Sequence, residues 1–359
     1  MTTSHGADRD LHVALIGYGK GGAVFHAPLI DAVPGLRLSA VVTGNPERAS
    51  AVRERYPHTE VIASPEQVWQ RPGDFDIVVI TTPNDSHVPL AHAALKAGMA
   101  VVVDKPLALT AAEARELAAE AERLDQMLTV FHNRRWDSDF LTLWRIIDEG
   151  RIGTVHRFES RFERWRPESK DTWREQGGVE TGGGLLYDLG THLIDQAVNL
   201  FGPVTRVYAE LDTRRPGVTA DDDTFVALTH AGGVRSHLWM SALTAQLGPR
   251  FRVLGDATAF TTRGLDGQER RLERGERPDA PDWGEEPKVK WGAYGLDGDL
   301  RAIPSENGNY PAFYAAVRDA VAEGEPLPVN LHEVIHGLEI IEAARRSDEA
   351  GEVVPLPAT

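Results

Sequence analysis

The sequence predicts two domains, an α/β domain with a parallel sheet followed by an α+β domain with a mostly antiparallel sheet. The first observation is the length of 359 residues, which exceeds what one ordinary core holds. The second is that short β-branched runs alternate with helical patterns from residue 11 onward, as in parallel βαβ units. The third is that longer runs of alternating polarity follow, as in antiparallel strands. We therefore expect a disordered tail over residues 1–10, a first domain over 11–132 and a second over 133–359.

In the first domain, five runs are expected to be strands, and they are apolar on both faces, which suits strands buried between helices. Helices are expected over 88–98 and 110–126. The second helix begins with a good N-cap, Thr110, followed three residues later by Glu113. The five strand runs are residues 11–17, 36–42, 76–82, 100–105 and 127–132.

In the second domain, residues 154–166, 204–214 and 224–242 show the alternation of antiparallel strands, and the last run contains a Gly-Gly turn. Residues 264–309 are rich in Gly, Pro and charge, so we expect a long loop with little regular structure. The last helix is expected from about Leu331 to Ser347. Its one apolar face predicts that it docks back on the core.

The composition narrows the functional classes. A formal charge of −16 at pH 7 would repel a nucleic acid backbone, so no nucleic acid partner is expected. No run approaches the roughly 20 apolar residues that span a bilayer, and the polar N-terminus, MTTSHGADRD, lacks the apolar core of a secretory signal. The chain has no cysteine, which excludes disulfides and thiolate chemistry and fits a cytoplasmic location. With a nucleic acid and a membrane both disfavoured, we expect the partner of this chain to be a small molecule.

The stretch VALIGYGKGGAVFHAPLI follows the first expected strand and contains G-x-G-x-x-G as Gly17, Gly19 and Gly22, with Tyr18 inside the turn. The three glycines suit a tight turn, close approach of the backbone to a pyrophosphate, and close packing of helix on strand. This predicts a dinucleotide-binding Rossmann domain. The alternative is a glycine-rich turn without a ligand, which does not explain why it begins a series of parallel strands.

The residues at the end of the second strand indicate whether NAD or NADP is bound, because NAD enzymes usually carry an acidic residue there that binds the ribose. Here the sequence VVTGNPERA places Thr43 at that point and Arg48 five residues later. A hydroxyl and a guanidinium suit a 2′-phosphate, which favours NADP. Glu47 leaves NAD open, and Arg48 also fits a solvated helix residue.

Two further strands end in polar residues, at the edge where open α/β sheets bind ligands. Thr82 and Asn84 follow the third strand, and Lys105 follows the fourth. His87 is expected either to cap the next helix or to contact the cofactor. The alternative for Lys105 is a surface ion pair with Asp104, worth under about 1 kcal/mol.

The stretch GGGLLYDLGTHLIDQ, residues 182–196, places Asp188 and His192 four residues apart. On a helix the two side chains share a face and can form a hydrogen bond, so the carboxylate would orient the imidazole and favour its charged form. An imidazole suits removal of a hydroxyl proton at neutral pH. The alternative is a buried Asp/His pair that only braces the helix. Asp195 is expected to be structural.

Together with TTPN, DKP, FHAPLI and FHNRRWDSDF, these motifs resemble the Gfo/Idh/MocA oxidoreductases, and most of all their NADP-dependent scyllo-inositol dehydrogenase branch. The resemblance implies that Lys105 is the active-site lysine, Asp188 the substrate-side carboxylate and His192 the catalytic acid/base. It also implies a large, open second sheet that covers the active site with one face and packs in a homodimer or homotetramer with the other. Asp104 replaces the family's Glu before the lysine, which puts any positioning role of that acid in doubt.

From these residues and this resemblance we expect hydride transfer between NADP, or less favourably NAD, and a secondary alcohol or ketone of a cyclic polyol or sugar. Two alternatives remain open at this point. One is a non-catalytic regulator that binds a nucleotide or sugar, and the other is a reductase of an imine or amino sugar. A cluster near the second domain's first strand suits either a polyol pocket or sheet packing, namely Arg164, Trp165, Trp173 and Arg174.

A competing pattern is HEVIH, residues 332–336, which matches the H-E-x-x-H of zinc peptidases. On a helical wheel His332 and His336 lie opposite the apolar face of the last helix. We therefore expect both to face solvent, and no metal site is predicted.

Overall fold

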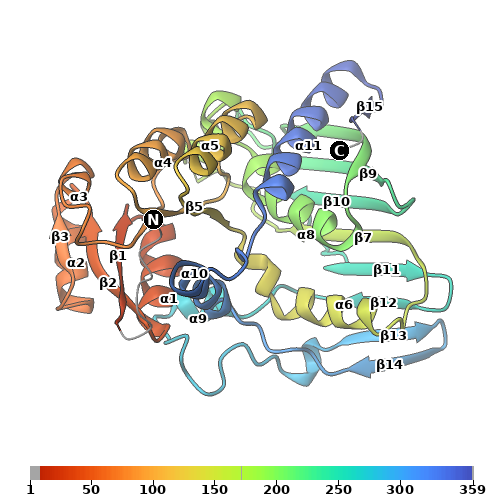
Figure 1. Cartoon of the computed structure of the whole chain (residues 1–359). Helices are drawn as coiled ribbons and strands as arrows, with labels where there is room; N and C mark the ends of the chain where they lie inside the picture. Colours follow the sequence, from red (N-terminus) through yellow and green to blue (C-terminus); the bar gives the residue numbers. More distant parts are fainter. Residues whose placement is uncertain (1–8, 171, 358–359) are drawn as a thin grey trace.

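The computed structural model describes residues 9–170 and 172–357, which form two sheets with helices packed against them (Figure 1). The expected tail, residues 1–10, lies outside the described residues except for Arg9 and Asp10. Arg9 forms an ion pair with Asp76 at 2.6 Å. Within the described ranges, no helix combines the length and the apolar character needed to cross a bilayer.

The first sheet has six parallel strands in the order β3-β2-β1-β4-β5-β6. The five expected runs are all strands in it. The additional strand, β3, is only three residues long, too short to leave a pattern in the sequence. The order reverses direction between β1 and β4, which is where such sheets bind ligands. The strands are β1 (Leu11–Ile16), β2 (Leu36–Val42), β3 (Glu60–Ile62), β4 (Ile77–Ile80), β5 (Ala100–Asp104) and β6 (Leu128–Phe131).

Helices cover both faces of this sheet, so its strands are buried almost throughout. Both expected helices are confirmed as α4 and α5. Thr110 and Glu113 form a complete capping box, in which each side chain accepts a hydrogen bond from the other residue's backbone N–H. The helices are α1 (Ala27–Ala32), α2 (Pro46–Arg55), α3 (Glu66–Trp69), α4 (His87–Lys96) and α5 (Ala111–Arg123), with π-helical residues Gly21–His26 before α1.

The second sheet has nine strands in the order β14-β13-β12-β11-β7-β10-β9-β8-β15. Among the described strands of this second sheet, β7 and β10 form the one parallel pair, so the expectation of a mostly antiparallel sheet is confirmed. Gly233, with φ of +88°, closes the predicted β9–β10 turn. The strands are β7 (Val155–Glu163), β8 (Val204–Asp212), β9 (Asp223–His230), β10 (Arg235–Ser241), β11 (Phe251–Gly255), β12 (Ala259–Thr262), β13 (Gly292–Leu296), β14 (Asp299–Ile303) and β15 (Val354–Pro355).

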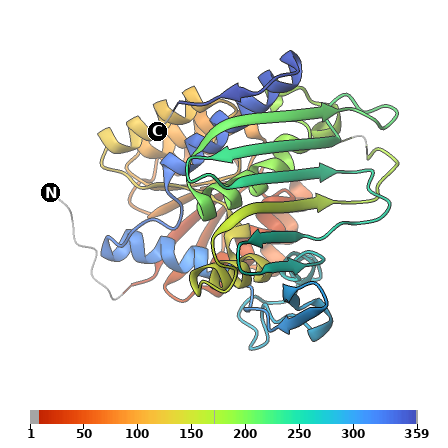
Figure 2. The same ribbon diagram turned by 90° about the vertical axis from the view of Figure 1, so that its right-hand side faces the viewer.

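Helices pack on one face of the second sheet and leave the other face open (Figure 2). The face toward the helices faces the first domain as well, so the seam between the two halves lies on this side. The helices are α6 (Ser138–Asp148), α7 (Trp173–Gln176), α8 (Thr191–Phe201), α9 (Gln268–Glu273), α10 (Pro311–Glu323) and α11 (Leu331–Ala350), with π-helical residues Leu186–Gly190 before α8.

The expectation of a structureless loop over residues 264–309 is wrong. The segment contains α9, β13 and β14. It is held by the buried side chain of Gln268, whose amide donates to the Trp136 carbonyl at 3.0 Å and accepts the Tyr310 backbone N–H at 2.7 Å. Hydrogen bonds to distant residues, which leave no periodic pattern, therefore order a sequence rich in turn-forming residues.

The last helix, α11, docks on the core as expected, against β8, α8 and α5, and contacts of α10 and of the segment before α11 join the two halves. The rings of Phe131 in β6 and Phe313 in α10 lie 5.0 Å apart, edge to face. Beside them, the Tyr314 hydroxyl and His26 Nδ1 are 2.5 Å apart. The Thr129 hydroxyl donates to the Val329 carbonyl at 3.2 Å. These contacts fix the position of the second domain against the first.

One expectation about α11 is wrong, because His336 is buried rather than turned to solvent. Its Nε2 accepts the Val204 N–H at 2.9 Å, which leaves the proton on Nδ1, 2.9 Å from a carboxylate oxygen of Glu339. The helix is packed between β8 on one side and α5 and α8 on another, so its apolar stripe is not its only buried face. His332, by contrast, is exposed.

Candidate active site

An open cleft runs along the carboxyl ends of β1, β4 and β5 and against the second domain. It encloses about 1780 Å³ of space not filled by protein atoms, counting the solvent at its mouth. The cleft is therefore not smaller than typical ligand pockets, which enclose about 300 to 1,000 Å³. Of the residues predicted from the sequence, Tyr18, Gly22 and Thr43 do not line it. Those that do are Gly17, Gly19, Arg48, Thr82, Asn84, His87, Lys105, Asp188 and His192.

The glycine turn after β1 has the shape of a phosphate cradle. Gly17 has φ of +100°, and a Cβ there would lie 3.0 Å from the Thr81 carbonyl. A Cβ on Gly19 would meet no atom within 4 Å, so this backbone faces open space in the cleft. A Cβ on Gly22 would lie 2.3 Å from the Gly17 carbonyl, which is the close packing of helix on turn. The Tyr18 side chain belongs to the core. The turn therefore fits a pyrophosphate approached by bare backbone.

The end of β2 supplies polar groups where a ribose would lie. The Thr43 hydroxyl accepts the Asn45 N–H at 3.3 Å, and the Asn45 side chain caps α2 by accepting the Arg48 N–H at 2.9 Å. Arg48 is exposed on the first turn of α2. Within the described part of the chain, its guanidinium has no ion-pair partner, so its charge remains available to an anion. Asn45 was not predicted, although its place before Pro46 marks a helix start.

His87 connects the segments that follow β4 and β5. Its Nδ1 lies 2.8 Å from the Pro106 carbonyl, and its Nε2 lies 2.9 Å from the Thr82 carbonyl. The ring thus lies between two backbone carbonyls, with one nitrogen near each, and α4 begins after Ser86 without a side-chain cap. His87 therefore positions the segment that carries Lys105. The nearby Asn84 amide points to the Thr181 carbonyl of the second domain at 3.4 Å.

Lys105 reaches across the seam to Asp188 rather than pairing with its neighbour. Its ammonium donates to the Asp188 backbone carbonyl at 2.6 Å and to the Asp188 carboxylate at 3.1 Å. The Asp104 carboxylate instead accepts the Lys105 backbone N–H at 2.8 Å and lies 3.7 Å from His26 Nε2. Burial would raise the pKa of Asp104, but His26 and Lys105 hold it below its ordinary value. The alternative of an Asp104–Lys105 surface ion pair is therefore wrong.

Asp188 does not form the predicted hydrogen bond with His192. It lies in the π-helical turn Leu186–Gly190, whose wider repeat removes the alignment of side chains four residues apart. Its carboxylate lies 3.5 Å from Arg174 as well as next to Lys105. Burial alone would raise the pKa of Asp188, yet Lys105 and Arg174 outweigh it and lower the pKa to about 2. This carboxylate is charged and holds the lysine.

His192 is buried in the wall of the cleft with only 7% of its surface exposed. Its Nδ1 is buried without a hydrogen-bond partner, so Nε2 is the nitrogen that the cleft can reach. Burial, followed by the positive charges of Lys105 and Arg134, lowers the pKa of His192 well below 6.5. The expectation that a carboxylate favours the charged ring is therefore wrong. The ring is neutral and ready to accept a proton.

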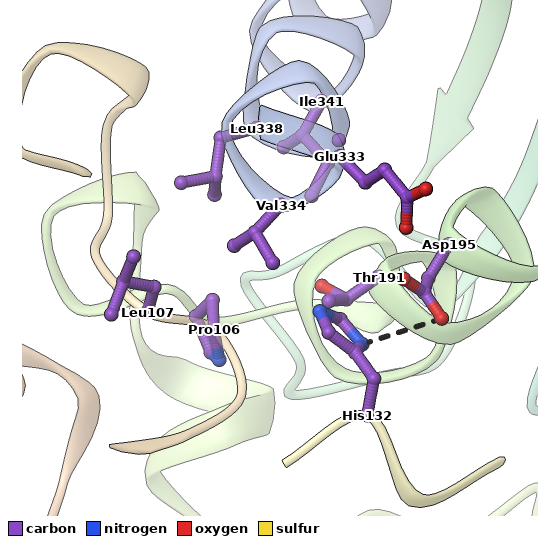
Figure 3. Close-up of a pocket in the computed structure, with 10 residues that line it drawn as sticks. Pro106, Leu107, His132, Thr191, Asp195, Glu333, Val334, Leu338 and Ile341 are labelled. Carbon is purple, nitrogen blue, oxygen red and sulfur yellow. Dashed lines mark ion pairs between the residues drawn. The ribbon is translucent and has the colours of Figure 1, made fainter. Parts of the chain in front are cut away.

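A second, narrow hollow lies between α11, α8 and the segment after Lys105 (Figure 3). The His132 ring points into it and lies 3.8 Å from the Asp195 carboxylate. Asp195 accepts two hydrogen bonds from Arg135, at 2.7 and 3.0 Å, which matches its structural interpretation. The hollow has room for about one water molecule, so it does not hold a substrate.

Several cations on the cleft wall were not predicted from the sequence. Arg134 comes from the segment after β6, and Arg166 and Lys170 come from the segment after β7. Of the predicted cluster, Arg164, Trp173 and Arg174 line the cleft, whereas Trp165 is 57% exposed and lies outside it. The signal in the sequence is RWRPESK, residues 164–170, a dense group of cations in an acidic chain.

The comparisons with known proteins cover both halves of this arrangement. Two family models match, "Oxidoreductase family, NAD-binding Rossmann fold" over residues 11–132 and "Oxidoreductase family, C-terminal alpha/beta domain" over residues 145–356. The chain is 43% identical over 343 residues to the uncharacterized oxidoreductase YdgJ of Escherichia coli, which covers 93% of this chain and 95% of YdgJ. It is 34% identical over 350 residues to the scyllo-inositol 2-dehydrogenase (NADP(+)) IolW of Bacillus subtilis, which covers 96% of each chain.

Solved structures agree with these matches. The oxidoreductase YPO2259 of Yersinia pestis superposes with a TM-score of 0.90 at 41% identity, over 98% of this chain and 99% of that chain. The fold of both halves is thus shared with these proteins. The chain belongs to the Gfo/Idh/MocA family of oxidoreductases.

Proposed function

We propose that the chain transfers a hydride between NADP and a carbon that bears a secondary hydroxyl on a cyclic polyol or sugar. The observation that carries this proposal is that the glycine turn at Gly17, the ammonium of Lys105 and the neutral imidazole of His192 meet on one cleft. Oxidising an alcohol requires a base for the hydroxyl proton and a positive charge beside the oxygen. The name of IolW, an NADP-dependent scyllo-inositol dehydrogenase, supports a cyclic polyol.

In this proposal each residue has one role. When bound, the nicotinamide ring supplies the hydride chemistry. The backbone around Gly19 binds the pyrophosphate, and His192 accepts the hydroxyl proton at Nε2. Asp188 occupies two of the three N–H groups of Lys105, so the third is free to donate to the substrate oxygen. Lys105 then stabilises the negative charge that develops on that oxygen as the proton leaves.

The preference for NADP rests on Arg48. Its charge has no carboxylate partner among the described residues, and it lies in the first turn of α2, just after the end of β2, where an arginine can bind a 2′-phosphate in this fold. Glu47, beside it in the first turn of α2, is the residue that would serve NAD instead.

Turnover across a substrate panel tests the proposed function. Nicotinamide absorbance is followed with NAD and with NADP for inositols, aldoses and ketoses. We expect NADP-dependent turnover of at least one cyclic polyol or sugar, and loss of it in Lys105→Met, which keeps the aliphatic stem but not the charge. Tight binding of NADPH without turnover of any polyol or sugar would contradict the proposal.

We also propose that the open face of the second sheet packs against another copy of the chain. The rings of Phe225, His237 and Trp239 lie on that face with centroids 5.2 to 6.0 Å apart. Arg161 stacks on Trp239 at 3.9 Å, and none of the described helices covers the group (Figure 2). Trp239→Glu should lower the molar mass measured by light scattering to that of a monomer, whereas an unchanged mass would exclude this interface.

A further inference from the structure

Three cations form one wall of the cleft, Arg164, Arg166 and Lys170. All three line the main cleft with Lys105 and His192, and all three also line the two hollows that adjoin it. One of these hollows continues past Asp188. The positive group therefore lies where a substrate held at Lys105 would extend.

The three side chains form no direct ion pair among the described residues, although the more distant carboxylates of Asp188 and Glu269 act to raise the pKa of Arg164. Within residues 9–170 and 172–357, no ion pair involves Arg164, Arg166 or Lys170. Two other arginines near Asp188 and Glu269 are paired, because Arg134 lies 2.8 Å from Glu269 and Arg174 lies 3.5 Å from Asp188. In a chain with a formal charge of −16, acidic residues are abundant, so three unpaired cations on one wall are not a result of composition.

The backbone holds the two arginines on one side of the strand extension. Arg164 N–H donates to the Ser241 carbonyl at 2.8 Å, and Arg166 N–H donates to the Ala242 carbonyl at 2.7 Å. A bridge between Trp165 and Leu243 keeps this segment extended. Side chains two residues apart then share a face, here the face of the cleft, while Trp165 points away.

Holding these charges together has an electrostatic cost that an anion would relieve. Burial, followed by the neighbouring charge of Arg166, lowers the pKa of Arg164. Its guanidinium lies 4.7 Å from the ring centroid of Phe162, a contact that leaves its N–H groups free. Planar guanidinium groups match carboxylate and phosphate oxygens, and such charge-assisted hydrogen bonds are among the strongest that proteins form.

We propose that the substrate carries an anionic group, a carboxylate or a phosphate, and that Arg164, Arg166 and Lys170 bind it beside the reacting carbon. This rests on the proposed function, which it extends to a class of acidic or phosphorylated sugars and polyols. The cofactor's phosphates have the same chemistry, but their expected sites are at the glycine turn and at Arg48. The lysine of that turn, Lys20, is paired with Glu273 at 2.7 Å.

Matched substrates test the charge requirement. The ratio kcat/KM is measured with NADP for glucose, glucuronate and glucose 6-phosphate, and for inositol and an inositol phosphate. In the wild-type protein we expect an anionic member of a set to exceed its neutral partner by about tenfold or more, because hydrogen bonds to charged groups are worth about 1.5 to 3 kcal/mol. Arg166→Gln and Arg164→Gln should each remove most of this advantage, measured as the ratio of kcat/KM for the charged substrate to that for its neutral partner. Arg37→Gln, the same charge change on an exposed residue of β2, is the control.

Two further measurements separate the sources of the anion. The NADPH dissociation constant, from nicotinamide fluorescence, should stay within about twofold in Arg166→Gln. A loss of NADPH affinity of more than about fivefold would assign the cluster to the cofactor and overturn the proposal. Calorimetry with glucuronate and with glucose 6-phosphate in the presence of NADP reports binding even if no compound is turned over. Binding that is lost in Arg166→Gln supports the anion site, even where no compound is turned over and the proposed function fails. The anion site is overturned if neither compound binds, or if charged and neutral substrates are turned over equally.

Discussion

Replacing Asp188 with Asn decides whether this carboxylate acts through Lys105 or through His192. In the structure it accepts a hydrogen bond from Lys105 at 3.1 Å and none from His192. The fall of the Asp188 pKa from 3.8 to about 2 corresponds to roughly 2 kcal/mol of stabilisation of the carboxylate by its cations. Because the side chain is 29% exposed, solvent screening leaves about 1 to 2 kcal/mol for the pair with Lys105. Asp188→Asn should therefore lower kcat/KM by about 5- to 30-fold.

A double-mutant cycle assigns this loss to a partner. The values of kcat/KM are measured by nicotinamide absorbance for Asp188→Asn, Lys105→Met and the double variant, and again with His192→Gln in place of Lys105→Met. With Lys105 replaced, Asp188→Asn should cost less than about 0.5 kcal/mol further, because its partner is gone. With His192 replaced, the cost of Asp188→Asn should persist. A larger coupling energy with His192 than with Lys105 would refute this reasoning, and NADPH affinity within about twofold in each variant checks that the fold is kept.

The site leads to predictions for four other substitutions and for the pH dependence of the reaction. His192→Ala should lower kcat by about 100-fold or more with NADPH affinity nearly intact. Burial and Lys105 lower the pKa of His192, so its base form persists at acidic pH. The value of kcat/KM for alcohol oxidation should therefore keep more than half of its plateau at pH 6.5. A midpoint of this pH profile at or above 6.5 would mean that His192 titrates as an ordinary imidazole. Gly22→Ala places a Cβ 2.3 Å from the Gly17 carbonyl and should lower the melting temperature by several degrees, whereas Gly19→Ala should keep the melting temperature and weaken NADPH binding. Arg48→Gln should weaken NADPH binding about tenfold and leave NADH binding within about twofold, as measured by fluorescence titration.

Much of the fold is predictable because its signals are local. The β-branched runs of the first sheet are buried on both faces, and the capping box at Thr110 satisfies its own backbone groups, so each leaves a pattern in adjacent residues. Elements held by distant residues leave no such pattern. Strand β3 is three residues long, and the segment of α9, β13 and β14 depends on buried hydrogen bonds of Gln268 to Trp136 and Tyr310.

The candidate site divides in the same way. The glycine turn and Lys105 are predictable because they follow strands of known direction, whose carboxyl ends share one edge. The partner of Asp188 is not, because Lys105 lies 83 positions earlier in the chain and approaches only when the two halves pack together. The hydrogen bond predicted between Asp188 and His192 is wrong because the prediction assumed an α-helix. The turn at Leu186–Gly190, which contains Asp188, is π-helical.

Burial and the surrounding positive charge together decide the protonation of His192. Burial lowers the pKa of His192 most, and the charges of Lys105 and Arg134 lower it further, which drives the proton off the ring. Arg164 and Arg166 line the same cleft as His192, so an anion bound to them would bring negative charge into that cleft. A bound acidic substrate should therefore raise the pKa of His192, because less positive charge then opposes the charged ring. The pKa in the pH profile of kcat, which reports the complex, should exceed that of kcat/KM, which reports the free enzyme, for an anionic substrate only. Equal values for charged and neutral substrates would show that the cluster and the imidazole do not share one electrostatic field.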